Sequence, residues 1–159
     1  EVWLVVSPQN PFKDEKSLID STHRFNMLKT ALGHSARYKA CDIELRMPLP
    51  SYTINTLNKL IEQYPDTEFQ IIMGADNLSA IDRWKDADTI FERHKVLVYP
   101  RPGADIINSK YTQNIVITQA PVIDISSTFV RELLKQGRDV QFLVPQGVAD
   151  YIKVNQIYR

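Results

Sequence analysis

Five short apolar runs divide the chain, and their length and composition predict β-strands. They cover residues 2–6, 38–45, 69–73, 96–99 and 115–117. The first run, VWLVV, is an uninterrupted series of β-branched, aromatic and aliphatic residues, which is typical of a strand buried on both faces. The run at 38–45 is less regular, and we expect a weaker strand there.

Between these runs, apolar residues recur every three or four positions, which predicts amphipathic helices. The predicted helices span residues 18–32, 54–64, 78–81, 87–91, 126–134 and 145–152. Gly33 and Gly137 follow two of them as C-terminal glycines. Ser51 or Thr53 lies near the start of the second helix, and Pro145 suits the first position of the last.

Strands that alternate with helices predict an α/β fold with a parallel sheet and right-handed crossovers. Ligands of such sheets bind beyond the carboxyl ends of the strands. Three loops occupy that position, at residues 7–13, 74–77 and 100–103. We expect a polar, anion-tolerant crevice there, lined by Asn10, Lys13, Asp76, Asn77 and Arg101.

Composition and charge narrow the classes of function. The 159 residues carry 19 Lys and Arg against 19 Asp and Glu, which leaves no net charge. A broad surface for nucleic acid or an acidic membrane would show a basic excess, so we expect neither partner. The longest apolar run, residues 2–6, is far shorter than the ~20 residues that span a bilayer. We therefore expect a cytoplasmic protein, and a homo-oligomer is compatible with this composition.

Cysteine, histidine and glycine exclude several common kinds of site. Cys41 stands alone, and His23, His34 and His94 lack metal-ligand spacing, so we expect no disulfide and no protein-bound metal. The 5 glycines are too far apart for a G-x-G-x-x-G or P-loop motif. A phosphate site in this chain would therefore use helix N-termini and basic side chains.

The segment SSTFVR, residues 126–131, is the most informative one for chemistry. Hydroxyl groups at a helix start normally cap the first backbone N–H groups. Arg131 falls in the predicted first turn, where the helix dipole disfavours a cation. A guanidinium, free N–H groups and clustered hydroxyls together could hold a polyphosphate. From the residues alone, both an anion site and a capped surface helix remain open. In either case we expect four apolar residues on the inner face of this helix, Phe129, Val130, Leu133 and Leu134.

Two further groups allow both a functional and a structural interpretation. Gly74 and Asp76 follow a buried strand, where a ligand could approach the backbone and a carboxylate could accept both hydroxyls of a ribose. An ordinary turn with an N-cap aspartate is the alternative. Trp84 could stack on a flat ring while hydroxyls around Tyr52 and Thr53 bind a carboxylate. A half-buried core tryptophan is the alternative for Trp84.

Taken in order, these segments resemble the bacterial nicotinate-nucleotide adenylyltransferases of the nucleotidyltransferase α/β-phosphodiesterase superfamily. The matching segments span essentially the whole chain, namely 2–13, 50–53 with 56–57, 74–78, Trp84, 101–103, 125–128 with Arg131, and 144–159. The resemblance implies a Rossmann-like, doubly wound parallel sheet in a single domain, residues 1–159. It also implies the reaction of ATP with nicotinate mononucleotide to give deamido-NAD and pyrophosphate, with Mg²⁺.

The resemblance further implies a role for each matching residue. The ATP-binding residues would be Gly74, Asp76, Ile125, Ser126, Ser127, Thr128 and Arg131. The residues for the nucleotide acceptor would be Asn10, Lys13, Ser51, Tyr52, Thr53, Trp84 and Arg101. Trp84 would stack on the pyridine, and Tyr52 and Thr53 would fix its carboxylate. Arg131 and Lys13 would act in catalysis as charges on phosphate groups.

Two departures from the family pattern leave alternatives open. The family's Gly-rich turn with its H-x-G-H pair is absent from these residues, so we expect roughly 25–40 further N-terminal residues, the size of one βα unit. Phe12 stands where the family loop often has histidine, which predicts a small change in the packing of that loop. The alternatives are another acceptor, such as nicotinamide mononucleotide or phosphopantetheine, a non-catalytic nucleotide-binding module, and a purely structural domain.

Overall fold

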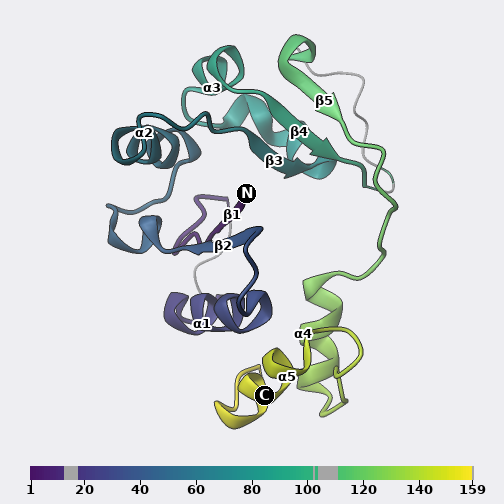
Figure 1. Ribbon diagram of the computed structural model, residues 1–159. Coiled ribbons are helices and arrows are strands. Elements are labelled where there is room, and N and C mark those ends of the chain that lie inside the picture. Colours follow the sequence, from purple (N-terminus) through teal and green to yellow (C-terminus); the bar gives the residue numbers. More distant parts are fainter. Residues whose placement is uncertain (13–17, 102, 104–110, 159) are drawn as a thin grey trace. The chain divides into compact units, whose positions relative to one another are not determined.

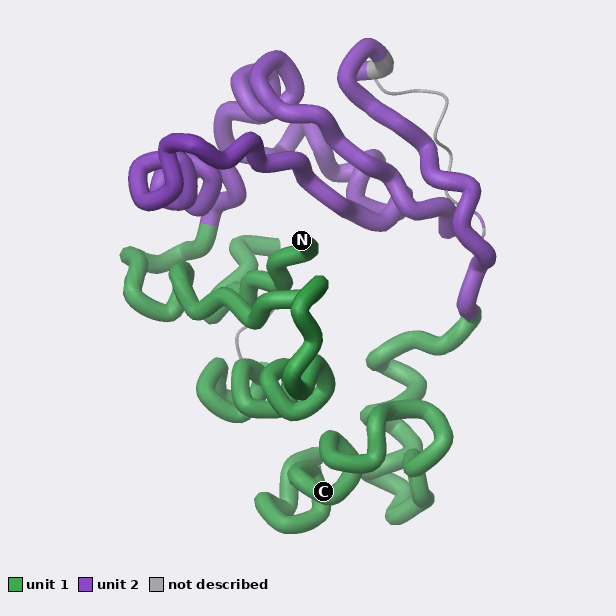
Figure 2. Tube along the Cα trace, viewed as in Figure 1, with its two compact units in different colours: residues 1–51, 124–159 green, residues 52–123 purple. Residues whose placement is uncertain are grey.

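The computed structural model describes residues 1–12, 18–101, 103 and 111–158, and Figure 1 shows their strands and helices. The chain divides into two compact units, coloured separately in Figure 2. Unit 1 contains Glu1–Ser51 and Asp124–Arg159, and unit 2 contains Tyr52–Ile123. None of the helices in the described ranges is long and apolar enough to cross a membrane.

The N-terminal part of unit 1 is a strand–helix–strand arrangement. β1 (Val2–Val5) pairs in parallel with β2 (Tyr38–Cys41), and α1 (Ser21–Leu32) connects them. The helix begins after Asp20, whose carboxylate accepts a hydrogen bond from a backbone amide of the first turn. It ends at Gly33, whose φ of 55° is a conformation that favours glycine.

The C-terminal part of unit 1 consists of α4 (Ser127–Lys135) and α5 (Gln146–Val154). A small core holds it against α1. Its buried members are Val148, Ile152 and Ile157, and the partly buried residues around them include Ile19, Met27 and Leu134. Because Leu134 belongs to α4 and Met27 to α1, this core connects the first and last segments of the chain.

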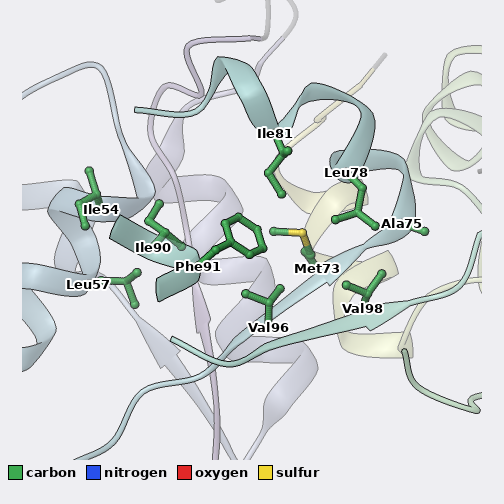
Figure 3. Packing of buried hydrophobic residues seen from close by; sticks show 10 residues of the cluster. All are labelled: Ile54, Leu57, Met73, Ala75, Leu78, Ile81, Ile90, Phe91, Val96 and Val98. Carbon is green, nitrogen blue, oxygen red and sulfur yellow. The ribbon is translucent and has the colours of Figure 1, made fainter. Parts of the chain in front are cut away.

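Unit 2 contains a second parallel sheet, in the order β3 (Ile71–Gly74), β4 (Val96–Tyr99) and β5 (Ile115–Ile117). Its other elements are α2 (Thr53–Gln63), η3 (Ala75–Arg83), α3 (Ala87–Arg93) and the short η4 (Thr112–Asn114). Side chains from α2, η3, α3 and the first two strands form one core, in which Met73 and Phe91 lie at the centre of the view in Figure 3. The most deeply buried large side chains are Ile90, Val96 and Val98.

The predicted α/β architecture with parallel strands is confirmed, and so are the positive φ angles that place Gly33 and Gly137 after helices. The strand predicted at 38–45 is wrong in its second half. It ends at Cys41, because Asp42 leaves the extended conformation and a 3-10 helix, η2 (Ile43–Arg46), follows. The first strand is half-buried instead of buried on both faces, since it pairs with β2 alone among the described strands.

Three helix predictions also need correction. The first helix starts at Ser21, not at residue 18, because the Asp20 cap fixes its beginning. Pro145 is the N-cap of α5 and not its first residue. Phe129 is 51% exposed although we predicted it on the inner face of its helix. Val130 is buried, and Leu134, four residues later on the same face, packs against the small core of unit 1. Phe129 lies about 100° around the helix from Val130 and so points away from this face.

Candidate functional site

Three of the predicted site residues lie together in unit 2, where β3 and β4 end. Gly74 is the last residue of β3, opposite Tyr99 of β4, and Asp76 lies in the first turn of η3. Arg101 follows β4, and its Nε lies 3.7 Å from the Asp76 Oδ1. The Asn77 Nδ2 donates to the carbonyl of Gly74 at 3.4 Å. The segments that follow β3 and β4 therefore meet at Asp76 and Arg101.

A side chain on residue 74 would displace the carboxylate of Asp76. A Cβ on Gly74 would lie 2.3 Å from the Asp76 Oδ1 and 3.4 Å from the Arg101 Nε. The carboxylate can therefore lie against the backbone only because residue 74 is glycine. Asp76 and Arg101 are 62% and 47% exposed, so their ion pair contributes little to stability and both charges face water. This leaves a carboxylate that can accept hydrogen bonds from a diol, with a cation beside it.

The start of α2 and the end of η3 carry the other site residues of unit 2. Tyr52 is the N-cap of α2 and Thr53 its first residue, and no side-chain hydrogen bond from Tyr52 caps the helix. Trp84 follows η3, and the rings of Tyr52 and Trp84 both pack, half-buried, against the core. The structural interpretation of Trp84 is therefore confirmed, while its stacking on a pyridine stays a prediction. Lys85, which the sequence analysis missed, places its Nζ 5.1 Å from the Tyr52 ring centroid.

The start of α4 in unit 1 combines a cap with exposed hydroxyls. Ser126 is the N-cap, and its Oγ accepts a hydrogen bond from the Phe129 amide at 3.1 Å. Ile125, Ser127 and Thr128 are exposed beside it. The first turn contains no acidic residue, so the partial positive charge of the helix start is not offset within the helix. The capping interpretation is thus confirmed for Ser126, and the exposed hydroxyls leave the anion site open.

Arg131 is the fifth residue of α4, so its predicted place in the first turn is wrong by one residue. Long helical side chains point back toward the N-terminus of their helix. Its Nη2 accordingly donates to the Thr128 Oγ1 at 3.1 Å, which brings the guanidinium to the helix start. The residue is half-buried, and this exposed hydrogen bond orients its guanidinium.

Tyr158, near the C-terminus, lies in the neighbourhood of this cation. Burial raises the pKa of the Tyr158 hydroxyl above its usual value, while the positive charges of Arg131 and Arg24 act in the opposite direction. The charges of Arg131 and Arg24 are therefore close enough to influence this hydroxyl within unit 1. No local pattern of the sequence marks this proximity, because the three residues belong to three different segments.

The loop after β1 is held by residues that follow it in the chain. The carbonyl of Gln9 accepts a hydrogen bond from the Ser51 amide at 3.0 Å, which places the segments of Asn10 and Ser51 side by side. Arg24 of α1 donates to two other carbonyls of this loop. The sequence analysis missed Arg24, although two prolines in the loop indicate an excess of carbonyl acceptors over N–H donors. Lys13 lies outside the described residues.

The predicted ATP residues are divided between the two units. Gly74 and Asp76 belong to unit 2, whereas residues 125–128 and Arg131 belong to unit 1. The predicted acceptor residues are divided in the same way, since Asn10 and Ser51 belong to unit 1 and the others described belong to unit 2. Among the residues that the structure describes, no group of three or more His, Cys, Asp and Glu side chains could hold a metal ion.

Comparison with known proteins gives a consistent assignment. A cytidylyltransferase-like family model matches residues 1–133. The chain is 40% identical over 148 residues to a probable nicotinate-nucleotide adenylyltransferase from Bacteroides fragilis, covering 93% of this chain and 74% of that protein. It is 39% identical over 161 residues to the protein of the same name from Flavobacterium psychrophilum, covering 100% of this chain and 83% of that protein.

Solved structures agree with the fold. The nicotinic acid mononucleotide adenylyltransferase of Plasmodium falciparum complexed with NaAD gives a TM-score of 0.80 at 21% identity, covering 99% of this chain and 82% of that one. The same enzyme complexed with APC gives a TM-score of 0.77, also at 21% identity and with the same coverage. This likeness confirms the predicted Rossmann-like fold class. Together with the family model and the two bacterial relatives, it shows that the chain belongs to the cytidylyltransferase-like family and, within it, to the nicotinate-nucleotide adenylyltransferases.

Proposed function

We propose that the protein transfers the adenylyl group of ATP to nicotinate mononucleotide, giving deamido-NAD and pyrophosphate. A phosphate oxygen of the mononucleotide attacks the α-phosphorus in line, and the bond from that phosphorus to the bridging β-oxygen breaks. The single observation that carries this proposal is the 40% identity to a nicotinate-nucleotide adenylyltransferase over 93% of the chain. The protein would contribute positioning and charge to such a reaction and no covalent nucleophile.

The start of α4 would hold the triphosphate. Arg131 lies beside Thr128 with its guanidinium at the helix start, and the exposed hydroxyls of Ser127 and Thr128 accompany it. Negative charge that develops on the leaving pyrophosphate would be stabilised by this cation and by the positive end of the helix dipole. Ser126 would fix the start of α4 through its cap, and Ile125 would lie beside the phosphate-binding residues Ser127, Thr128 and Arg131.

The end of β3 would hold the adenosine. The backbone at Gly74 carries no side chain that would obstruct the ribose, and the Asp76 carboxylate could accept both of its hydroxyls. Arg101, whose Nε lies 3.7 Å from the Asp76 Oδ1, would help to orient that carboxylate. We infer that Arg101 also contributes positive charge toward the nucleotide acceptor.

The acceptor would be recognised by its carboxylate and its ring. The start of α2, at Tyr52 and Thr53, has no side-chain cap from Tyr52 and would offer backbone N–H groups to the nicotinate carboxylate. Trp84 would add its exposed face to the pyridine, and Asn10 and Ser51 would contact the mononucleotide. Lys13, outside the described residues, would meet its phosphate. A carboxylate at the helix start favours the acid over the amide acceptor.

We propose that Mg²⁺ enters with ATP, as part of the substrate. Bound there, it would neutralise charge on the phosphates, and its ligands would be phosphate oxygens and water. A reaction that consumes ATP and a mononucleotide fits the cytoplasmic location predicted from the composition.

The test is a chromatographic and pyrophosphate-release assay of the full-length protein with MgATP and one acceptor at a time. We expect deamido-NAD and pyrophosphate in equal amounts from nicotinate mononucleotide. Nicotinamide mononucleotide should react more slowly, and phosphopantetheine not at all. A clear preference for nicotinamide mononucleotide or phosphopantetheine would refute the proposal that nicotinate mononucleotide is the acceptor. ATP binding without pyrophosphate release from any acceptor would instead identify a nucleotide-binding module.

A further inference from the structure

The loop that follows β1 has an unusual balance of hydrogen-bonding groups. Residues 7–12 read SPQNPF, and the two prolines lack an N–H, whereas every residue has a carbonyl acceptor. The Phe12 amide is used within the loop, where it donates to the Asn10 Oδ1 at 2.9 Å. The loop therefore depends on donors from elsewhere in the chain to fix its carbonyls.

Arg24 of α1 supplies most of these donors. Its Nη1 donates to the carbonyl of Ser7 at 2.6 Å and its Nη2 to the carbonyl of Pro8 at 2.9 Å. Its Nε donates to the carbonyl of Ile19, just before α1, at 3.2 Å. One half-buried guanidinium thus ties the loop to the start of the helix.

These contacts require the shape of a guanidinium as well as its charge. Two adjacent carbonyls accept from the two terminal nitrogens of one planar fork, which a lysine ammonium on a flexible stem cannot reproduce. With the Ser51 amide on the carbonyl of Gln9, three consecutive carbonyls of the loop are fixed directly before Asn10.

We propose that Arg24 is a positioning residue for the nucleotide acceptor, because its guanidinium fixes the loop that presents Asn10. This inference rests on the proposed function, in which Asn10 contacts the mononucleotide. Arg24 itself touches no substrate. Its loss would increase the number of conformations open to the loop and so weaken acceptor binding, while the start of α4 and the Gly74 corner would keep their contacts with ATP.

A matched control exists in the same helix. The Asn26 Nδ2 donates to the Tyr151 hydroxyl at 3.2 Å, and this half-buried bond ties α1 to α5 without touching the loop. Asn26→Ala therefore removes a tertiary hydrogen bond of α1 and leaves the loop alone. A purely structural role of Arg24 predicts the same kinetic outcome for Arg24→Lys and Asn26→Ala.

The experiment compares wild-type, Arg24→Lys and Asn26→Ala full-length proteins. For Arg24→Lys we expect the KM and Kd of nicotinate mononucleotide to rise about tenfold and the KM of ATP to change by less than about twofold. Hydrogen exchange at the amides of Gln9, Asn10 and Phe12 should accelerate in Arg24→Lys alone. Asn26→Ala should lower Tm and leave both KM values unchanged.

Three results would overturn the proposal. In one, Arg24→Lys leaves the acceptor KM and the loop exchange unchanged. In the second, the KM values of ATP and acceptor rise together in both variants, which indicates a general structural effect. In the third, the wild-type protein does not bind nicotinate mononucleotide, which overturns the proposed function as well. A wild-type protein that binds this acceptor without turnover overturns the proposed reaction only, because the Kd comparison still tests Arg24.

Discussion

The two corners assigned to ATP are built on different physical principles. At the end of β3 in unit 2, the shape of the backbone determines where the Asp76 carboxylate lies, because a Cβ on Gly74 would lie 2.3 Å from that carboxylate. At the start of α4 in unit 1, the proposed phosphate binding depends on charge, because the guanidinium of Arg131 is held at the helix start by a hydrogen bond to Thr128. Substitutions should therefore disturb geometry in the first corner and electrostatics in the second.

The cores behind these corners differ as well. Met73, Ala75 and Leu78, which flank Gly74 and Asp76, belong to the large core of unit 2. Among the described residues of α4, Val130 alone is buried, and Leu134 packs against the small core of unit 1 built around Val148, Ile152 and Ile157. A side chain at the start of α4 can thus change with little effect on packing. At the end of β3, an added Cβ meets the exposed side chains of Asp76 and Arg101, so a substitution there displaces the site residues themselves.

The largest effect should come from Arg131→Ala. We expect kcat/KM for ATP to fall about 100-fold, since loss of a charged phosphate contact costs about 3 kcal/mol in the transition state. Tm should stay within about 2 °C of wild type, because the hydrogen bond of Arg131 to Thr128 is exposed and lies within a single helix. Steady-state kinetics and calorimetry measure both.

Lys135→Ala is the matched control, because Lys135 is a cation of the same helix, 57% exposed and paired with Glu132 at 2.8 Å. This variant should keep the ATP kinetics of the wild type. A large loss of Tm in Arg131→Ala with unchanged ATP kinetics would show that this arginine has a structural role. It would contradict the proposal that the start of α4 binds phosphate through the charge of Arg131.

Gly74→Ala should have the next largest effect. The added Cβ must displace the Asp76 carboxylate, so we expect kcat/KM for ATP to fall about 30-fold through misplacement of the ribose contact. Gly33→Ala is the control, because residue 33 has a φ of 55° and no atom within 4 Å of an added Cβ. It should cost about 1–3 kcal/mol of stability and leave activity intact. Equal activity losses in both variants would contradict a specific role of Gly74 in placing the Asp76 carboxylate.

A pair of smaller substitutions separates capping from phosphate binding within α4. Ser126→Ala removes the cap and should lower the free energy of unfolding by about 1 kcal/mol. Thr128→Ala frees the guanidinium of Arg131 and should raise the KM of ATP about fivefold with unchanged stability. Denaturant titration and ATP kinetics of both variants check this. A stability loss for Thr128→Ala as large as that for Ser126→Ala would mean that the two hydroxyls have the same role.

The smallest effect concerns pH. Burial raises the pKa of the Tyr158 hydroxyl above its usual value, and the positive charges of Arg131 and Arg24 partly offset this rise. The folded state therefore holds the proton more tightly than the unfolded state. This contribution to stability is complete below about pH 10 and is lost as the pH rises through the folded pKa. Tyr158→Phe should therefore reduce the fall in stability on going from about pH 9 to pH 11. An unchanged alkaline profile would show that Tyr158 is equally solvated in both states.

Several features of the fold and the site could be predicted from the sequence because their cause is local. The apolar run predicted at 69–73 marks β3, which spans Ile71–Gly74, to within two residues, so Gly74 and Asp76 could be placed at the end of a strand. The serine at 126 marks the start of α4, since a hydroxyl at that position caps a helix. The glycine at 33 marks the end of α1 for an equally local reason.

The features that the sequence analysis missed depend on tertiary contacts. Arg24 donates to the backbone carbonyls of residues 7 and 8; the prolines of this loop indicate an excess of carbonyl acceptors, but no sequence pattern indicates which side chain donates to them. Lys85 lies over the ring of Tyr52, which is far from it in the chain. The exposure of Phe129 depends on which face of α4 meets the core of unit 1, and the helical period alone does not decide between neighbouring positions.

The division of labour between the two corners is tested most directly by the inhibition constants of pyrophosphate and adenosine in wild type, Arg131→Ala and Gly74→Ala. We expect Arg131→Ala to raise the inhibition constant of pyrophosphate more than about tenfold and that of adenosine less than about twofold. Gly74→Ala should instead raise the inhibition constant of adenosine more than about tenfold and that of pyrophosphate less than about twofold. If each variant weakened both inhibitors to the same extent, the two corners would not hold opposite ends of ATP.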